Sequence, residues 1–84
     1  MTPALVIWAD AHSADIASWT PAEDIEDVGE WLNRTVGWVV PDAKKGHVTV
    51  CQSVTPDDQV DHVLHIPEAM VRQIHYLVVK PTDG

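Results

Sequence analysis

Short apolar runs separated by turn residues, rather than long helical stripes, organise this chain. Two of these runs, at 35–41 and 47–53, are rich in β-branched residues, and the residues between them include Asp, Lys and Gly. Runs of this kind on either side of a turn are typical of a β-hairpin. The sequence therefore predicts two paired strands there. Gly37, inside the first strand, indicates a bulge or a close approach of another backbone.

Three more strands are predicted from the remaining apolar runs. The first, at 4–9, is apolar on both alternating faces, which indicates burial on both sides or pairing with another chain. Another lies at 60–66, after a turn that Pro56 and two following Asp favour. The last run supports two interpretations, a helix over 67–77 or a tight 3-10 turn followed by a strand over 71–79. The β-branched residues near its end favour the turn and strand.

An acidic segment between the first two strands carries the signature of a helix start. Thr20 is a candidate N-cap, Pro21 suits the first helical position, and Glu23 stands three residues after the cap. The acidic residues that follow interact favourably with the positive end of a helix dipole. The sequence predicts a helix over about 21–26. Whether it continues is left open, because Gly29 weakens a helix interior.

Together these elements predict one mainly β domain over 1–80, with a flexible polar tail at 81–84. Five short strands, a 3-10 turn before the last, and a short acidic helix between the first two are typical of a five-stranded SH3-like or Sm-like barrel. A chain of 84 residues buries only a small core, so its four tryptophans are expected to matter for stability. Open strand edges also predict a homo-oligomer.

The charge balance narrows the choice of partner. Thirteen Asp and Glu stand against five Lys and Arg, which gives a net charge of −8. This argues against nucleic acid, because binding a phosphate backbone depends on clustered Lys and Arg. The single cysteine fits a reducing compartment, and no apolar run approaches the roughly 20 residues that span a membrane. We therefore expect a cytoplasmic protein without a signal peptide.

No arrangement of residues predicts catalysis, a cofactor or a metal. His47, Cys51 and His62 would approach one another across neighbouring strands, and such a set can bind zinc. Their spacing does not demand this, and ordinary strand histidines are expected instead. A lone cysteine in an apolar strand is typical of an inert small hydrophobe rather than a nucleophile. The sequence therefore predicts a protein that is not an enzyme.

Three motifs resemble a known group of proteins. They are T-V-G-W-V-V at 35–40, V-T-V-C-Q-S at 48–53 and V-L-H-I-P-E-A-M-V at 63–71, and a W-A-D motif ends the first strand at 8–10. In these motifs the chain resembles small uncharacterised proteins encoded by actinobacterial phages and prophages. The resemblance implies a phage accessory protein that acts in the bacterial cytoplasm, with a small β-barrel fold.

Protein binding is the function that fits these observations. Two tryptophans flank the acidic segment, and Trp is enriched in binding hot spots. The sequence predicts an interaction module that acts on a host or phage protein through an acidic, Trp-bearing surface made by Trp19, Glu23, Asp24, Glu26, Asp27 and Trp31. The alternative is an oligomeric Sm-like ring that binds RNA or a small nucleotide, although the negative charge speaks against it.

Overall fold

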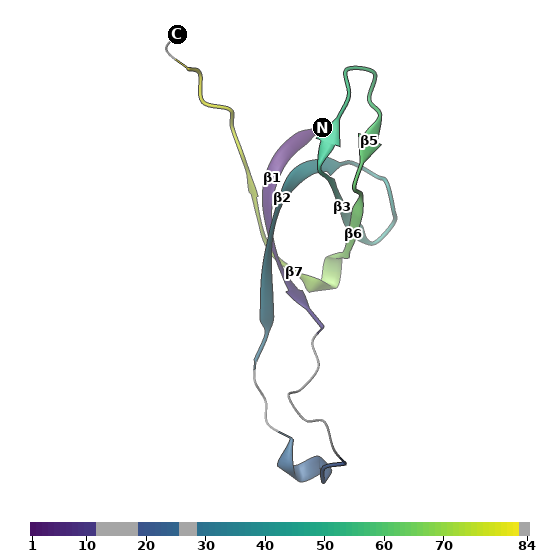
Figure 1. Cartoon of the computed structure of the whole chain (residues 1–84), viewed down its shortest axis with the longest axis vertical. Helices are drawn as coiled ribbons and strands as arrows, with labels where there is room; N and C mark the ends of the chain where they lie inside the picture. The colour runs from purple at the N-terminus through teal and green to yellow at the C-terminus, as the bar shows by residue number, and fades with distance from the viewer. Residues whose placement is uncertain (12–18, 26–28, 83–84) are drawn as a thin grey trace.

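The computed structural model describes residues 1–11, 19–25 and 29–82, and it consists mainly of β-strands (Figure 1). Five strands form one sheet in the order β6-β3-β2-β1-β7. Their bounds are β1 (Thr2–Asp10), β2 (Trp31–Val40), β3 (His47–Cys51), β6 (Leu64–Pro67) and β7 (Val71–Tyr76). Two short strands, β4 (Ser53–Val54) and β5 (Val60–Asp61), form a separate hairpin. Two 3-10 turns, η1 (Ala22–Asp24) and η2 (Glu68–Met70), complete the described elements.

The antiparallel ladder between β1 and β2 is the longest in the molecule. It begins where Thr2 faces Val39 and ends where Asp10 faces Trp31. Residues that face each other in such a ladder lie on the same side of the sheet. Trp8 and Thr35 lie on one side, and the indole Nε1 of Trp8 donates a hydrogen bond of 2.9 Å to the Thr35 hydroxyl. The indole is therefore satisfied although its ring packs against the core.

The hydrophobic core is small and lies on the concave side of the curved sheet. Its centre is made by one fully buried residue from each of three strands, Val6, Val50 and Ile66. Partly buried apolar side chains surround this centre, namely Trp8, Val39, Val48, Val71 and Ile74. Strands β1, β3 and β6 are thus held together by burial, in addition to their hydrogen bonds.

The strand β3 is buried on both of its faces. Val50 belongs to the core, while Thr49 and Cys51, whose side chains point the opposite way, are each only 2 % exposed. The buried Thr49 hydroxyl lies 2.7 Å from Nδ1 of His65 on β6, so its polar group has a partner. This burial explains why the strand is a nearly continuous run of small or β-branched residues.

Gly37 on β2 marks a close approach of two backbones. A Cβ atom built on this residue would lie 2.8 Å from the carbonyl oxygen of Cys51 on β3 and 3.4 Å from Cβ of Val50. No side chain larger than hydrogen fits this contact without moving the strands. The close approach expected from the glycine inside the strand is confirmed.

The strand predictions agree with the structure in most places. The hairpin predicted at 35–53 is present as β2 and β3, although β2 begins earlier, at Trp31. The turn and strand interpretation of the last run is confirmed by η2 and β7. The strand predicted at 60–66 is interrupted between β5 and β6, because His62 adopts a left-handed φ of 47° that no regular strand accommodates.

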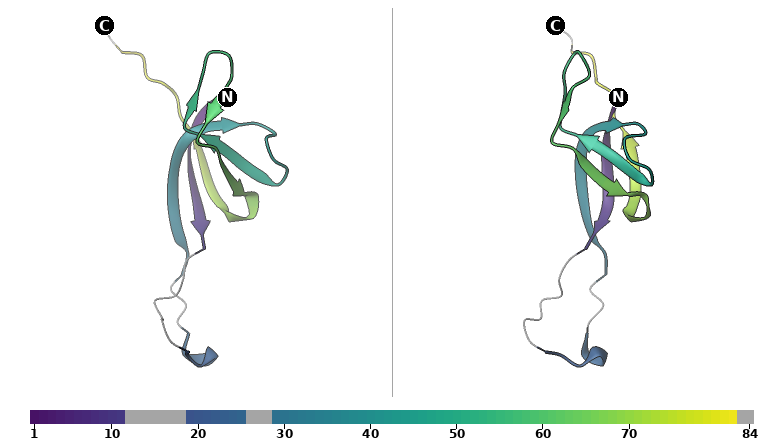
Figure 2. Two further views of the ribbon diagram at one scale, coloured as in Figure 1. Left: turned by 45° about the vertical axis from the view of Figure 1, so that its right-hand side comes forward. Right: turned by 90° about the vertical axis from the view of Figure 1, so that its right-hand side faces the viewer.

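Two parts of the predicted fold class are wrong. The sheet is open rather than a closed SH3-like or Sm-like barrel, since β6 and β7 stand at opposite edges of the strand order. Figure 2 shows how the sheet curls without β6 and β7 forming a ladder. The acidic helix between the first two strands is also absent. The described part of 21–26 contains only the three-residue turn η1, followed by Ile25 in an extended conformation.

The molecule is elongated, with principal extents of 59 × 31 × 20 Å. Figure 1 shows β1 and β2 running downward from the curled sheet, and η1 at the far lower end. The N-terminus and the last described residues of the chain lie toward the opposite end. No helix in the described part of the chain is long and apolar enough to cross a membrane.

Candidate interaction surface

The residues around η1 form the surface that we call the tip, defined here as Trp19, Glu23, Asp24 and Ile25. The turn is closed by two backbone hydrogen bonds, from Asp24 N–H to Pro21 O at 3.0 Å and from Ile25 N–H to Ala22 O at 3.3 Å. Pro21 precedes the turn with φ −54°, as its ring requires. The turn ends at Asp24, and none of its residues is buried. Most helical stability comes from packing of an apolar face, which this turn does not have.

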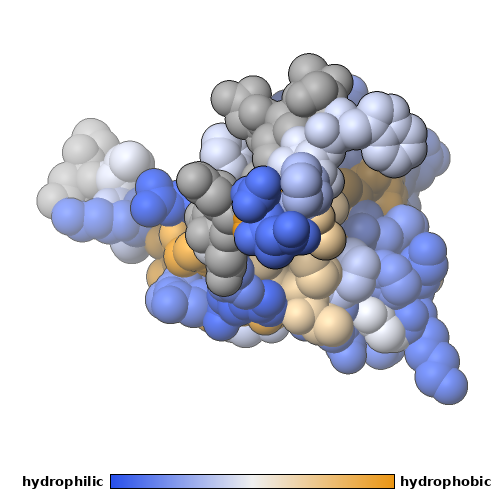
Figure 3. Space-filling view, turned by 90° about the horizontal axis from the view of Figure 1, so that it is seen from below, coloured by the Kyte–Doolittle hydropathy of each residue, from blue (hydrophilic) through white to orange (hydrophobic). Residues whose placement is uncertain are grey.

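The tip combines exposed apolar area with negative charge. Trp19 is fully exposed, and Ile25 is 58 % exposed. Glu23 and Asp24 lie in the first turn, and no basic residue lies in the last turn. Figure 3 looks at the molecule from the end that carries η1, and hydrophilic side chains stand in its foreground. An exposed aromatic ring and carboxylates within the same short segment are a combination that suits contact with a protein surface of positive charge.

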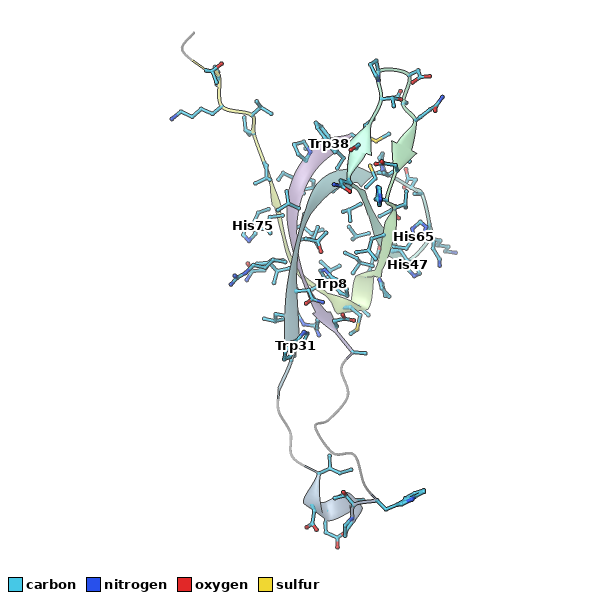
Figure 4. The ribbon with its side chains drawn as sticks, in the orientation of Figure 1. Trp8, Trp31, Trp38, His47, His65 and His75 are labelled. Atoms are coloured by element: carbon cyan, nitrogen blue, oxygen red, sulfur yellow. The ribbon has the colours of Figure 1, made fainter. Side chains whose placement is uncertain are left out.

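The structure separates the residues predicted to form one surface. Glu23 and Asp24 lie in η1, and Trp19 lies three residues before its first residue. Trp31 is 59 % exposed but is the first residue of β2, paired with Asp10 at the end of the ladder between β1 and β2 (Figure 4). The two tryptophans therefore do not flank a single acidic helix. Glu26 and Asp27 lie outside the described residues.

An ion pair joins Glu30, the residue before β2, to Arg72 on β7. Arg72 on β7 donates from Nε to both carboxylate oxygens of Glu30, at 2.9 and 3.1 Å, and its Nη2 also contacts Oε1. Its Nη1 donates to the carbonyl oxygen of Ala69 at 2.8 Å. These hydrogen bonds from Arg72 lower the pKa of Glu30, and the same bonds raise the pKa of Arg72.

A break in the strand register gives Arg72 this orientation. Ile7 faces Gln73, but the next residue, Trp8, faces Val71, so Arg72 is the extra residue of a β-bulge. A bulge turns its extra side chain out of the regular alternation. The sequence reasoning missed this pair, because Glu30 and Arg72 are 42 residues apart and no local pattern links them.

The histidines predicted as ordinary strand residues include one close pair. His47 on β3 and His65 on β6 lie edge to face with ring centroids 6.3 Å apart, and both are labelled in Figure 4. Nδ1 of His47 donates to the Lys45 carbonyl oxygen at 2.9 Å, since a carbonyl only accepts. This fixes the tautomer of a neutral His47 and leaves Nε2 as its free acceptor.

The zinc set considered from the sequence does not assemble. Cys51 is buried, whereas His62 is exposed on the link between β5 and β6, where its Nδ1 lies 3.1 Å from an oxygen of Asp61. No group of three or more His, Cys, Asp or Glu within residues 1–11, 19–25 and 29–82 is arranged to hold a metal ion. In the turn between β4 and β5, the Thr55 hydroxyl donates to Asp57 at 2.5 Å and lowers the pKa of that carboxyl group.

Comparison of the chain with protein-family models, with curated proteins and with solved structures finds no match.

Proposed function

We propose that this chain is a non-enzymatic interaction module that binds a partner protein through the tip. The observation that carries the proposal is the complete exposure of Trp19, a few residues before the acidic turn η1 that holds Glu23 and Asp24 at the far end of an elongated molecule. An exposed tryptophan loses most from remaining in water and gains most when a partner covers it.

The chemistry of the tip favours a partner surface with an apolar pocket rimmed by Lys or Arg. The pocket would take the indole of Trp19, and the basic rim would lie against the acidic turn. The net charge of −8 would also speed the encounter with a basic surface, through long-range electrostatic attraction. In this proposal the partner is a host or phage protein, as the resemblance to actinobacteriophage proteins implies, and binding takes place in the bacterial cytoplasm.

The Sm-like ring does not gain support from the strand arrangement. That alternative required a closed barrel, and the sheet is open. The basic residues of the described chain are also spread over β2, the β2–β3 turn, β7 and the tail, as Arg34, Lys44, Lys45, Arg72 and Lys80. They do not line a common rim on which RNA phosphates would bind.

Matched variants test the proposal. The immobilised chain is incubated with actinobacterial lysate, and proteins captured by the wild type are compared with those captured by Trp19→Ala and Glu23→Lys. Trp31→Ala and Glu68→Lys serve as controls, because each removes an exposed residue of the same type outside the tip. We expect a captured protein that both tip variants lose and both controls retain. Equal capture by all five proteins would refute binding through the tip.

A further inference from the structure

We propose that the free edge of β7 pairs antiparallel with the β7 edge of a second copy of this chain, so that two sheets join into one. This assembly surface lies on the sheet, away from the tip, and goes beyond the proposed function. Four steps lead to it: the hydrogen-bonding pattern of the edge, the apolar residues along it, its charge, and its symmetry.

The backbone of β7 has unused hydrogen-bonding groups along its outer side. Leu5 faces His75, Ala4 faces Tyr76, and the Leu77 N–H continues the ladder with a 2.8 Å bond to Pro3 O. In an antiparallel pair, alternate residues direct both backbone groups to the partner strand. His75 and Leu77 therefore face β1, whereas Ile74 and Tyr76 direct their N–H and C=O groups outward.

Apolar side chains are exposed to solvent at the end of β7 and in the residues just beyond it. Tyr76 is 62 % exposed, and the two residues that follow Leu77, Val78 and Val79, are 91 % and 79 % exposed. These residues are β-branched or aromatic, the types that stabilise pairs between neighbouring strands. An exposed edge with this composition is a ready template for another strand, and no Asp, Glu or Pro within 69–80 protects it.

The charge of the edge permits two copies to approach. The chain has thirteen Asp and Glu, yet none lies between Ala69 and Pro81. Most of the negative charge that would repel a second copy is therefore carried elsewhere. Arg72, the basic residue of β7, is already neutralised by Glu30, so its charge does not oppose a second copy that carries the same pair.

A second copy fits this edge because an antiparallel pair of identical strands is symmetric. A two-fold axis through β7 brings the outward groups of Ile74 and Tyr76 opposite the same groups of the partner, and apolar side chains meet apolar side chains. The opposite edge is less suitable, since β6 has four residues and ends at Pro67. The small core, with Val6, Val50 and Ile66 at its centre, also leaves stability to be gained from burial between subunits.

The first experiment measures the mass in solution by size-exclusion chromatography with light scattering, at several protein concentrations. We expect twice the 9.3 kDa of one chain, with dissociation on dilution. Tyr76→Pro should give a monomer, because proline removes an outward N–H and no bond to β1. Tyr76→Ala, which keeps that N–H, should still dimerise, although more weakly. A wild type that remains monomeric at every concentration overturns the proposal, and so does a dimeric Tyr76→Pro.

The second experiment uses the unmodified chain, so it does not depend on how the proline variant folds. Amide hydrogen exchange is followed by NMR in a concentrated and in a dilute sample. The N–H groups of Ile74 and Tyr76 should exchange slowly only in the concentrated sample, whereas the N–H of Leu77 should be protected in both. Fast exchange of Ile74 and Tyr76 at both concentrations would mean that a dimer, if present, uses another surface, and it would refute pairing at β7.

Discussion

Arg72 and Glu30 form an ion pair that joins the bulge of β7 to the residue before β2. Strands β2 and β7 are the two neighbours of β1 in the sheet, so the pair connects them at this end. The guanidinium group binds both carboxylate oxygens. Bidentate arginine–carboxylate pairs of this kind fix geometry as well as charge. The pair therefore links the start of β2 to β7, the strand on the other side of β1.

The ion pair predicts a specific loss of stability in acid. The pKa of Glu30 in the folded chain is lowered from its ordinary value of 4.5 by the hydrogen bonds from Arg72. A lowered carboxyl pKa contributes stability that is present above this ordinary value and is lost as the pH falls through the folded pKa. Glu30→Gln should therefore be less stable than the wild type at neutral pH, and the difference should shrink as the pH falls below 4.5 and vanish once the pH is below the lowered pKa of Glu30.

Urea denaturation at a series of pH values measures this difference. Glu68→Gln is the control, because it removes an exposed carboxylate of η2 that is not paired with Arg72. The expectation fails if Glu30→Gln and the wild type keep the same difference in urea midpoint at acidic and at neutral pH. Both side chains are partly exposed, so the difference should also decrease in high salt.

Gly37→Ala should destabilise the fold by about 1–3 kcal/mol, the usual cost of forcing extra atoms into a packed site. The added Cβ would lie 2.8 Å from the Cys51 carbonyl oxygen, which belongs to the backbone of β3 and cannot rotate away. Val36→Ala, at the neighbouring exposed position of β2, should change stability by no more than about 0.5 kcal/mol. Urea unfolding curves of the three proteins measure the effect, and equal slopes allow their midpoints to be compared directly. Equal midpoints for Gly37→Ala and the wild type would contradict the prediction.

Ile66 should be the most sensitive position of β6 to truncation. It is 1 % exposed and forms the centre of the core together with Val6 and Val50. Ile66→Val should cost about 0.5–1.5 kcal/mol and Ile66→Ala about 2–5 kcal/mol, because the cavity grows with each methyl or methylene group removed. Val63→Ala, at a position that is 45 % exposed, is the control and should unfold near the wild-type urea concentration. A large effect at Val63 would indicate that the core lies elsewhere.

Trp19 should account for the most accessible part of the tryptophan fluorescence. It is fully exposed, whereas Trp8 is partly buried and hydrogen-bonded to Thr35. Acrylamide should therefore quench the emission of the wild type more strongly than that of Trp19→Phe. The urea midpoint should be unchanged, since this indole contributes nothing to the core. Stronger quenching in the variant, or a loss of stability, would place Trp19 in a packed environment and remove the basis of the tip.

The sequence predicts the strands of this fold better than their closure. The hairpin of β2 and β3 follows from alternating apolar residues around a turn, which are local signals. Whether the two edges of the sheet join depends on the curvature of all five strands and on the path of the chain through the three residues of η2. No local sequence pattern encodes this closure. The N-cap predicted at Thr20 is wrong, because Pro21 takes the cap position of η1 and no side chain caps the turn. Within the described residues the segment forms a single three-residue turn, and none of its residues is buried against the sheet.

The candidate surface could be foreseen only in part. A tryptophan and acidic residues near Pro21 are visible in the sequence, and the structure leaves Trp19 fully exposed. The position of Trp31 could not be foreseen, because strand β2 begins four residues earlier than its β-branched run. Trp31 is placed by the pairing of β1 with β2, which extends over nine facing pairs of residues.

The ladder between β1 and β2 also has a consequence for engineering. Asp10 and Trp31 face each other, so their Cα atoms are about 5 Å apart, the distance between paired antiparallel residues. The ladder fixes the distance that any joining sequence has to span, and lengthening such a connection costs little additional closure entropy. The segment 11–29 is therefore expected to be replaceable. Exchanging it for a tight turn or for a foreign recognition loop should leave β1, β2 and the Glu30 contact in place.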